Sequence, residues 1–270
     1  GHCCLPDDLR EWGVTMQVPT TRSSTSWGIG DLGDVATVAG WVAAQGGRAL
    51  ALSPLHAPTP VAPVPSSPYS PSSRRWRNPL LLDLRPLVPL APAPIQREVE
   101  ALLAHPVVDR DRVWALKRSA LEQVWAHDRD RREDDLARFR AAHGASLEGW
   151  ARFCALAEDH GGHWRSWPAS LRHPDSAAVA AAGDARADRV AFHAWLQLLL
   201  DEQLRAATEH GVRLLQDLAI GADPDGADAW LWQDLLADGI SVGAPPDDFA
   251  PDGQRWGLPP FIPWRLRDAG

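Results

Sequence analysis

The chain has 270 residues, with 27 Lys and Arg against 35 Asp and Glu, which gives a formal net charge of −8. This acidic balance argues against a nucleic-acid partner, because a phosphate-binding face needs a clustered surplus of Lys and Arg. The 45% hydrophobic content is that of a globular protein, and no apolar run approaches the roughly 18 residues of a membrane-spanning helix. We therefore expect a folded protein with no membrane segment.

The amino-terminal part contains a strand–helix–strand pattern. Residues 14–19 alternate apolar and polar side chains, which indicates a strand. From Asp34 onward apolar residues recur at helical spacing until Gly46-Gly47. Residues 49–53 are a short apolar run that is typical of a buried strand. A unit of this kind predicts a parallel sheet and an α/β fold.

The middle of the chain predicts a loop followed by helices. Residues 57–71 contain six prolines and indicate an extended loop. Residues 85–190 predict a mostly helical insertion, in which one helix is marked by Val113, Leu116, Lys117, Leu121 and Val124. The mixed-charge stretch 127–140 indicates a solvated helix face.

A second helix–strand pair follows. Phe192, Trp195, Leu196 and Leu199 restore helical periodicity, which Gly211 ends. Residues 212–220 are the strongest strand candidate in the chain. This order again fits a parallel sheet, whereas the remainder, rich in Gly, Pro, Asp and Trp, predicts loop.

Residues 28–33 match the G-x-G-x-x-G pattern of dinucleotide-binding proteins. Such a site needs a tight turn directly after the strand and an acid about 20 residues further on. Here a long loop separates the strand from the glycines, and no acid lies between Asp34 and Asp83. A nucleotide-dependent enzyme is therefore a distant alternative, and we expect no cofactor.

The chain also lacks a recognisable metal motif. Residues 223–228 resemble part of a calcium loop, but Asp228 stands where an EF-hand has Gly, and Asp234 where it has Glu. The histidines form no HExxH pattern, and Cys3, Cys4 and Cys154 have no CxxC spacing. We expect no metal site, free thiols and, since the first residues are acidic where a signal peptide is basic, a cytoplasmic location.

The loops after the three predicted strands are rich in Trp, Tyr, Asp and Gly and have almost no Lys. Residues 27–31 follow the first strand, Tyr69 the second, and Asp217 and Trp256 belong to the third. Ligands of parallel α/β folds bind at these carboxyl ends. Flat rings and carboxylates suit a neutral, polyhydroxylated ligand such as a carbohydrate.

Five segments resemble the 4-α-glucanotransferases known as amylomaltases or disproportionating enzymes, of the actinobacterial type. The segments are SWGIGDLGD (26–34), SPYSPSSRRWRNPLLLDL (67–84), LLDEQLRAA (199–207), QDLAIGADPDGADAW (216–230) and SVGAPPDDFAPDGQRWGLPPF (241–261). The resemblance implies about the first three strands of a (β/α)₈ TIM barrel with a mostly helical insertion. It divides the chain into a first βαβ portion (1–84), a helical insertion subdomain (85–190), and the third strand with active-site loops (191–270).

The resemblance also implies the activity, which is transfer of α-1,4-glucan segments between maltodextrins by a retaining double displacement through a covalent intermediate. It implies that Tyr69 contacts the sugar beside the scissile bond, that Asp217 holds the sugar in the cleaving subsite, and that Trp256 lies on the acceptor side. The mobile active-site loop corresponds to Gly243, Pro245, Pro246 and Asp247.

The family's nucleophile and acid/base stand in R-x-D-H-type and E-D-L-G-type motifs after later strands, and this sequence ends at Gly270 before either. Arg186-Ala-Asp188 precedes a predicted helix and is no counterpart, and Gln216 replaces the expected Gly or Arg. We therefore expect no catalytic carboxylate in this chain and a fragment that is inactive alone. Two alternatives stay open: a non-catalytic α-glucan-binding protein, and another α-glucan-active barrel enzyme of the amylase or branching type.

Overall fold

The computed structural model describes residues 10–269, and its centre is a parallel sheet of three strands. The strands are β1 (Gly13–Met16), β2 (Ala49–Leu52) and β5 (Arg213–Gln216), with β2 in the middle. Helix α1 (Leu32–Ala44) links β1 to β2, and helix α6 (Ala187–Thr208) precedes β5. The predicted parallel α/β arrangement is confirmed, with three of the eight strands that a closed (β/α)₈ barrel contains.

All three predicted strands are shorter in the structure, the second by one residue. The first ends at Met16, because a 3₁₀ helix, η1 (Val18–Thr20), begins near Pro19, which has no N–H for a ladder. The third ends at Gln216 instead of Ile220. After Asp217, whose N–H still donates to Leu52 O of β2, the backbone of Ala219 and Ile220 is bound by side chains described below.

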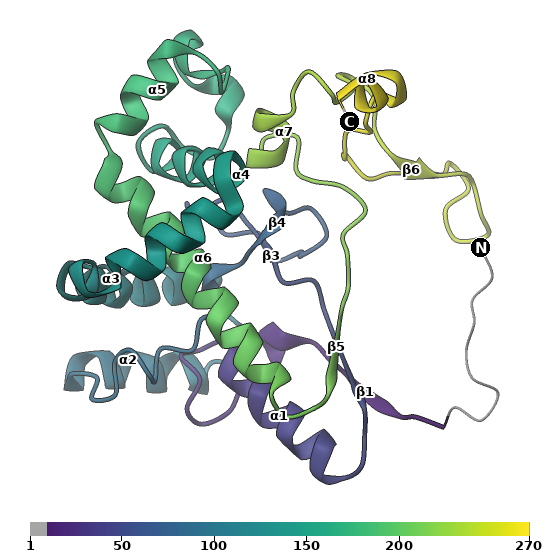
Figure 1. The fold of residues 1–270 in the computed structure, drawn as a ribbon. Coiled ribbons are helices and arrows are strands. Elements are labelled where there is room, and N and C mark those ends of the chain that lie inside the picture. Colours follow the sequence, from purple (N-terminus) through teal and green to yellow (C-terminus); the bar gives the residue numbers. More distant parts are fainter. Residues whose placement is uncertain (1–9, 270) are drawn as a thin grey trace.

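A two-stranded antiparallel sheet was not predicted. Strand β3 (His56–Ala57) pairs with β4 (Ser73–Arg77), and the proline-rich loop between them has no regular structure, as predicted. The hairpin escapes a pattern search because β3 has only two residues and β4 reads SRRWR, without an apolar alternation. This β3–β4 hairpin lies between the parallel sheet and the helices in Figure 1.

The predicted helical region is confirmed. It contains α2 (Ala93–Ala104), α3 (Arg110–Asp128), α4 (Glu133–His160) and α5 (Ala177–Asp184). The long helix α4, which is kinked at Gly144, packs against α6 and also contacts α7, and helices α2 to α5 gather on one side of the molecule (Figure 1). None of the helices in residues 10–269 has the length and apolar character required to cross a bilayer.

The carboxyl-terminal segment, predicted as loop, contains short regular elements. These are α7 (Ala227–Leu231), a small antiparallel pair of β6 (Gly243–Ala244) and β7 (Gln254–Arg255), and α8 (Pro263–Ala269). Each is too brief to show a periodic pattern.

Most of the tryptophans belong to the core. Nine of the 14 are buried: Trp27, Trp76, Trp114, Trp125, Trp150, Trp164, Trp167, Trp195 and Trp230. Around Phe153 the rings of Trp167 and Trp230 lie with centroids 5.3 and 5.7 Å away, which is the spacing of favourable aromatic pairs. The large rings therefore fill the interior between α4 and α7, and few remain for a ligand.

Two glutamines of α6 bind backbone groups at the end of β4 and in the segment that follows it. Gln197 accepts a hydrogen bond from Arg77 N (2.9 Å) and donates one to Arg77 O (2.9 Å). Gln203 binds Asp83 N and Asp83 O in the same way, at 2.8 Å each. Each side-chain amide thus replaces a neighbouring strand and satisfies both polar groups of one residue.

The one lysine of the chain, Lys117, is fully buried beneath this segment. Its ammonium donates to the carbonyl oxygens of Leu80 (2.7 Å) and Leu82 (2.8 Å). Burial lowers the pKa of Lys117 to about 8, while the nearby carboxylates of Asp31 and Asp83 act in the opposite direction. Lys117 stands in the apolar helix pattern of α3, and the structure places it on the same buried face.

The glycine-rich segment 28–33 forms the start of α1. The Asp31 carboxylate accepts from Gly33 N (3.0 Å) and Asp34 N (3.2 Å), and the Asp34 carboxylate accepts from Asp31 N (3.0 Å), which makes a capping box. A side chain at Gly30 would collide with the carbonyl of Val18. The glycines permit close packing, and a carboxylate already occupies the helix N-terminus where a phosphate would bind.

We expect Asp31→Asn to flatten the pH dependence of stability between about pH 4 and 6. Burial raises the pKa of Asp31 from 3.8 to about 6, so in this interval the folded chain holds a proton that the unfolded chain releases. The contribution of Asp31 protonation to the free energy of unfolding is therefore fully present below pH 3.8 and is lost as pH rises through about 6. Asparagine keeps the helix cap without this titration.

Urea denaturation of the wild type and the variant across this range measures the effect. Asp109→Asn is the matched control, because Asp109 also caps a helix by accepting from Arg112 N (3.1 Å) but does so at the surface. Equal pH slopes for the wild type and Asp31→Asn would contradict the prediction.

Candidate active site

Asp217 lies directly at the carboxyl end of β5. Its backbone N–H donates to Leu52 O (3.0 Å), which extends the ladder between β2 and β5 by one residue. The side chain of Asp217 is exposed, as expected for a residue at the ligand-binding end of a parallel sheet. The position of Asp217 is thus fixed by the sheet on its amino-terminal side.

Tyr69 reaches Asp217 from the proline-rich loop. Its hydroxyl donates a hydrogen bond of 2.9 Å to Asp217 Oδ2, across 148 residues of sequence. This hydrogen bond and the negative charge of Asp217 raise the pKa of Tyr69. The ring is 53% exposed, so the pair presents one aromatic face and one carboxylate to solvent.

Tyr69 and Trp256 line one pocket of about 360 Å³. The other lining residues are Ser67, Ser70, Ile220 and Leu258. The indole N–H of Trp256 donates to Gln254 Oε1 (3.0 Å), which orients its ring. A pocket of this size with aromatic walls and hydroxyl groups has the character of a small-molecule site.

The structure therefore brings Tyr69 together with both Asp217 and Trp256. The sequence reasoning missed Ile220 and Leu258, whose apolar side chains complete the wall, although both stand inside the segments that resemble the glucanotransferases.

The loop after β6 is outside this pocket. Gly243 pairs with Arg255 in the β6–β7 ladder, and a side chain at Gly243 would collide with Gln254 O. Pro245 and Pro246 follow, and the Asp247 carboxylate accepts from Phe249 N (2.8 Å) and Ala250 N (2.7 Å). Asp247 thus stabilises the turn, which carries Phe249 with 98% of its side chain exposed.

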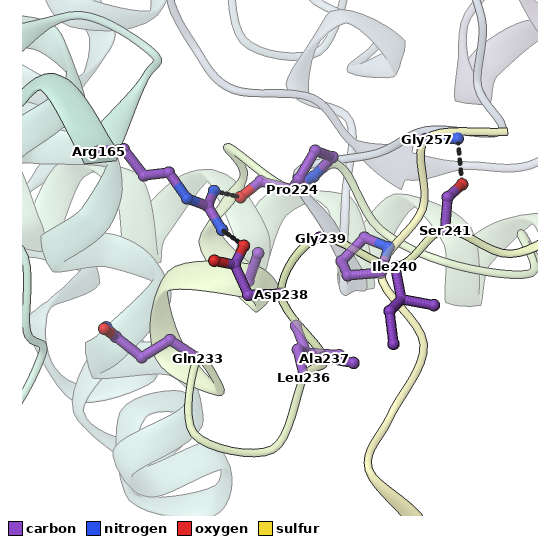
Figure 2. A pocket seen from close by; sticks show the side chains of 12 residues that line it. Arg165, Pro224, Gln233, Leu236, Ala237, Asp238, Gly239, Ile240, Ser241 and Gly257 are labelled. Atoms are coloured by element: carbon purple, nitrogen blue, oxygen red, sulfur yellow. Dashed lines mark hydrogen bonds and ion pairs between the residues drawn. The ribbon is translucent and has the colours of Figure 1, made fainter. Parts of the chain in front are cut away.

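A second pocket, of about 230 Å³, lies near the loop that follows α7 (Figure 2). Arg165 extends over it, donates to Pro224 O and approaches Asp238 to 3.9 Å, while Gly257 N donates to Ser241 Oγ (2.8 Å). The guanidinium is also bound to Asp225 at 3.2 Å. Arg165 therefore anchors the loop, and none of the predicted site residues lines this pocket.

Among residues 10–269 no group of three or more His, Cys, Asp and Glu side chains is arranged to hold a metal ion. In the acidic stretch 223–228, Asp223 accepts from Asp225 N (2.9 Å) and Asp228 from Arg74 N (2.8 Å). These carboxylates stabilise the backbone. Cys154 is a buried free thiol whose pKa burial raises, while Cys3 and Cys4 lie outside the described residues.

The prediction that Arg186 and Asp188 lie at the beginning of a helix is confirmed. They stand at the start of α6, where Asp188 accepts from Trp125 Nε1 (3.2 Å) and Arg129 Nη1 (3.1 Å). Gln216 is the last residue of β5 and pairs with Leu52.

Solved structures resemble this fold closely. The amylomaltase from Corynebacterium glutamicum matches with a TM-score of 0.79 and 32% identity, over 96% of this chain and 37% of that chain. The amylomaltase from Streptococcus agalactiae in complex with acarbose matches with a TM-score of 0.80 over 95% of this chain and 54% of that one. At 20% identity the second likeness concerns the fold alone. Both support the α/β fold predicted from the sequence.

Curated relatives carry the same name as the matching family. The 4-alpha-glucanotransferase of Mycobacterium tuberculosis is 44% identical over 289 residues, and that of Haemophilus influenzae is 32% identical over 296 residues. Each match covers 98% of this chain but only 40% and 42% of the relative, so the chain spans about two fifths of their length. The family model Glyco_hydro_77, described as 4-alpha-glucanotransferase, matches residues 16–270. The chain belongs to the 4-alpha-glucanotransferase family.

Proposed function

We propose that the protein transfers α-1,4-glucan segments between maltodextrins by a retaining double displacement, and that this chain supplies part of its substrate site. The observation that carries the proposal is the contact between Tyr69 and Asp217 at the carboxyl end of β5, beside a pocket walled by Trp256. A carboxylate accepts hydrogen bonds from sugar hydroxyls, and aromatic faces pack on the C–H faces of a pyranose ring.

The roles of the individual residues follow from this placement. Tyr69 contacts the sugar next to the scissile bond, Asp217 accepts from its hydroxyls, and Trp256 forms the acceptor-side wall. The loop of Gly243, Pro245, Pro246 and Asp247 closes over the bound glucan and displaces water, which favours transfer over hydrolysis. The exposed ring of Phe249 gives this loop an apolar surface for such a contact.

The catalytic step requires two carboxyl groups about 5 Å apart. Within residues 10–269 the Asp217 carboxylate accepts a hydrogen bond from the hydroxyl of Tyr69, and the chain spans about two fifths of the length of its relatives. We therefore propose that residues 1–270 bind maltodextrins without turning them over. We further propose that residues 85–190 are a helical insertion between two portions of the barrel, residues 1–84 and 191–270.

We also place the protein in cytoplasmic carbohydrate metabolism, with maltodextrins, starch or glycogen as its glucans. Support comes from the buried free thiol of Cys154, which suits a reducing compartment.

Titration calorimetry with maltoheptaose or acarbose, together with an assay for glucose and longer dextrins from maltotriose, tests the function. We expect saturable binding and no turnover by residues 1–270. Absence of binding would contradict the substrate site, and clear turnover would contradict the assignment of the catalytic carboxylates to other parts of the enzyme.

We expect Trp256→Ala to weaken maltoheptaose binding about fivefold, since an aromatic contact contributes on the order of 1 kcal/mol. Trp264→Ala is the matched control, because Trp264 is 62% exposed on α8 and lies outside the pocket. Titration calorimetry measures the affinity of both variants for maltoheptaose. Equal losses in the two variants would show that Trp256 makes no specific contact.

A further inference from the structure

The segment 217–220 leaves the sheet after β5 but is not loose. Arg74 Nη1 donates to Ala219 O (3.2 Å) and to Ile220 O (3.0 Å). The backbone N–H of Ala219 donates to His56 Nε2 (3.2 Å), so both polar groups of this residue are bound by side chains. Two side chains of the β3–β4 hairpin therefore provide hydrogen bonds that this backbone would otherwise have made to a neighbouring strand, beyond the four residue pairs of the β2–β5 ladder.

Packing contributes little to holding this segment. Leu218 and Ile220 are 65% and 62% exposed, and only Ala219, with its single methyl group, is buried. Because so little apolar surface is removed from water, the hydrogen bonds to Arg74 and His56 are the main restraint on the backbone after Asp217.

The hairpin that carries these side chains is itself fixed. Arg74 N donates to Asp228 Oδ2 (2.8 Å), and Asn78 N donates to Leu55 O (2.8 Å). Arg77, at the end of β4, is held by Gln197 of α6. The hairpin thus connects the segment 217–220 to the helical core.

We infer that Arg74 and His56 are positioning residues, which hold the segment 217–220 so that the carboxylate of Asp217 meets the hydroxyl of Tyr69. That Arg74 and His56 also affect glucan binding rests on the proposed function, because this effect requires that Asp217 binds the sugar. The geometric statement itself concerns Tyr69 and Asp217 and is testable without any ligand.

His56 performs this role as a neutral ring. Its Nε2 accepts a hydrogen bond from a backbone N–H, and an imidazolium has no acceptor. Burial and the positive charges of Arg74 and Arg77 lower the pKa of His56, whereas Asp217 acts against them. The hairpin therefore keeps His56 in the form that can accept.

Tyr69 supplies a direct readout, because it is the single tyrosine of the chain. A near-ultraviolet absorbance titration follows tyrosinate formation and so reports the pKa of Tyr69 alone. In the wild type we expect this pKa to lie above the ordinary value of about 10. Asp217→Asn, which removes the charge, gives the reference in which the pKa of Tyr69 returns toward that value.

The test compares Arg74→Met with Arg75→Met. Arg75 is the neighbouring residue of β4, and its side chain is exposed and does not bind the segment 217–220. We expect Arg74→Met to lower the pKa of Tyr69 toward the Asp217→Asn reference, Arg75→Met to leave it unchanged, and Arg74→Lys to restore part of the shift. Far-ultraviolet circular dichroism at each pH verifies that the fold is retained.

His56→Phe is titrated in the same way, so that the inference does not depend on a single variant. A pKa of Tyr69 that stays at the wild-type value in folded Arg74→Met or His56→Phe would overturn the inference. Failure of the wild type to bind maltoheptaose would contradict the proposed function and leave this result unaffected, so the two failures are distinguishable.

Discussion

The variant Lys117→Met is expected to lose about 3–5 kcal/mol of unfolding free energy at pH 7, which is the typical cost of removing one partner from a buried charged cluster. The ammonium satisfies the carbonyls of Leu80 and Leu82, and both would be left without a donor. Methionine fills the space of the aliphatic chain and recovers part of the desolvation penalty. The two orphaned carbonyls and the buried carboxylate of Asp31, which loses a nearby positive charge, outweigh that recovery.

Urea denaturation measures this loss, and Arg118→Met is the matched control. Arg118 is the next residue of α3, half-exposed, and forms a surface ion pair with Glu122 at 3.7 Å. Such a pair contributes under about 1 kcal/mol. A loss in Lys117→Met no larger than in Arg118→Met would refute the structural role of the buried ammonium.

The buried lysine also has a pH signature. Because burial lowers the pKa of Lys117 to about 8 from 10.5, the unfolded chain binds more protons between these values than the folded chain. The contribution of the neutral Lys117 amine to the free energy of unfolding is therefore fully present above pH 10.5 and is lost as pH falls through about 8. The difference between the wild type and Lys117→Met should widen as pH rises through this interval.

The second large effect concerns the ligand. We expect Asp217→Ala to weaken maltoheptaose binding by roughly tenfold to a hundredfold, since hydrogen bonds to a charged group contribute about 1.5–3 kcal/mol. The exposed carboxylate at the end of β5 is the acceptor proposed for the sugar hydroxyls, and alanine removes it without disturbing the ladder hydrogen bond from its own N–H.

Calorimetry at one temperature and salt concentration measures this affinity, with Asp252→Ala as the control. Asp252 is an exposed carboxylate in the turn between β6 and β7, outside the pocket. Similar binding by the wild type and Asp217→Ala would remove Asp217 from the substrate site. Similar weakening in both variants would point to a general effect of charge.

The local fold was largely predictable because its signals are local. The strand–helix–strand order and the helical insertion follow from apolar spacing, and the prolines between residues 57 and 71 mark the loop. Strand ends were less predictable. The apolar residues Leu218 and Ile220 extend the strand pattern of β5, yet the structure ends the strand at Gln216, and Arg74 binds the carbonyl oxygens of Ala219 and Ile220.

The candidate site was predictable only in part. That Tyr69 and Asp217 lie at one end of the sheet follows from parallel strand order, but the hydrogen bond joins residues 148 positions apart, which no local pattern encodes. The hydrogen bonds of Arg74 and His56 to the segment 217–220 could not be predicted for the same reason. Lys117 shows the converse case, in which a charged residue follows the apolar period of α3 and is buried as that period indicates.

The two glutamines of α6 have a consequence for variation in this chain. Gln197 and Gln203 bind only the N–H and C=O of Arg77 and Asp83, groups that every residue other than proline possesses. These four hydrogen bonds therefore do not depend on the side chains at positions 77 and 83, but proline at either position would remove one of them. A glutamate in place of either glutamine could accept but not donate, so this docking depends on two amide groups and is indifferent to the side chains they hold in place.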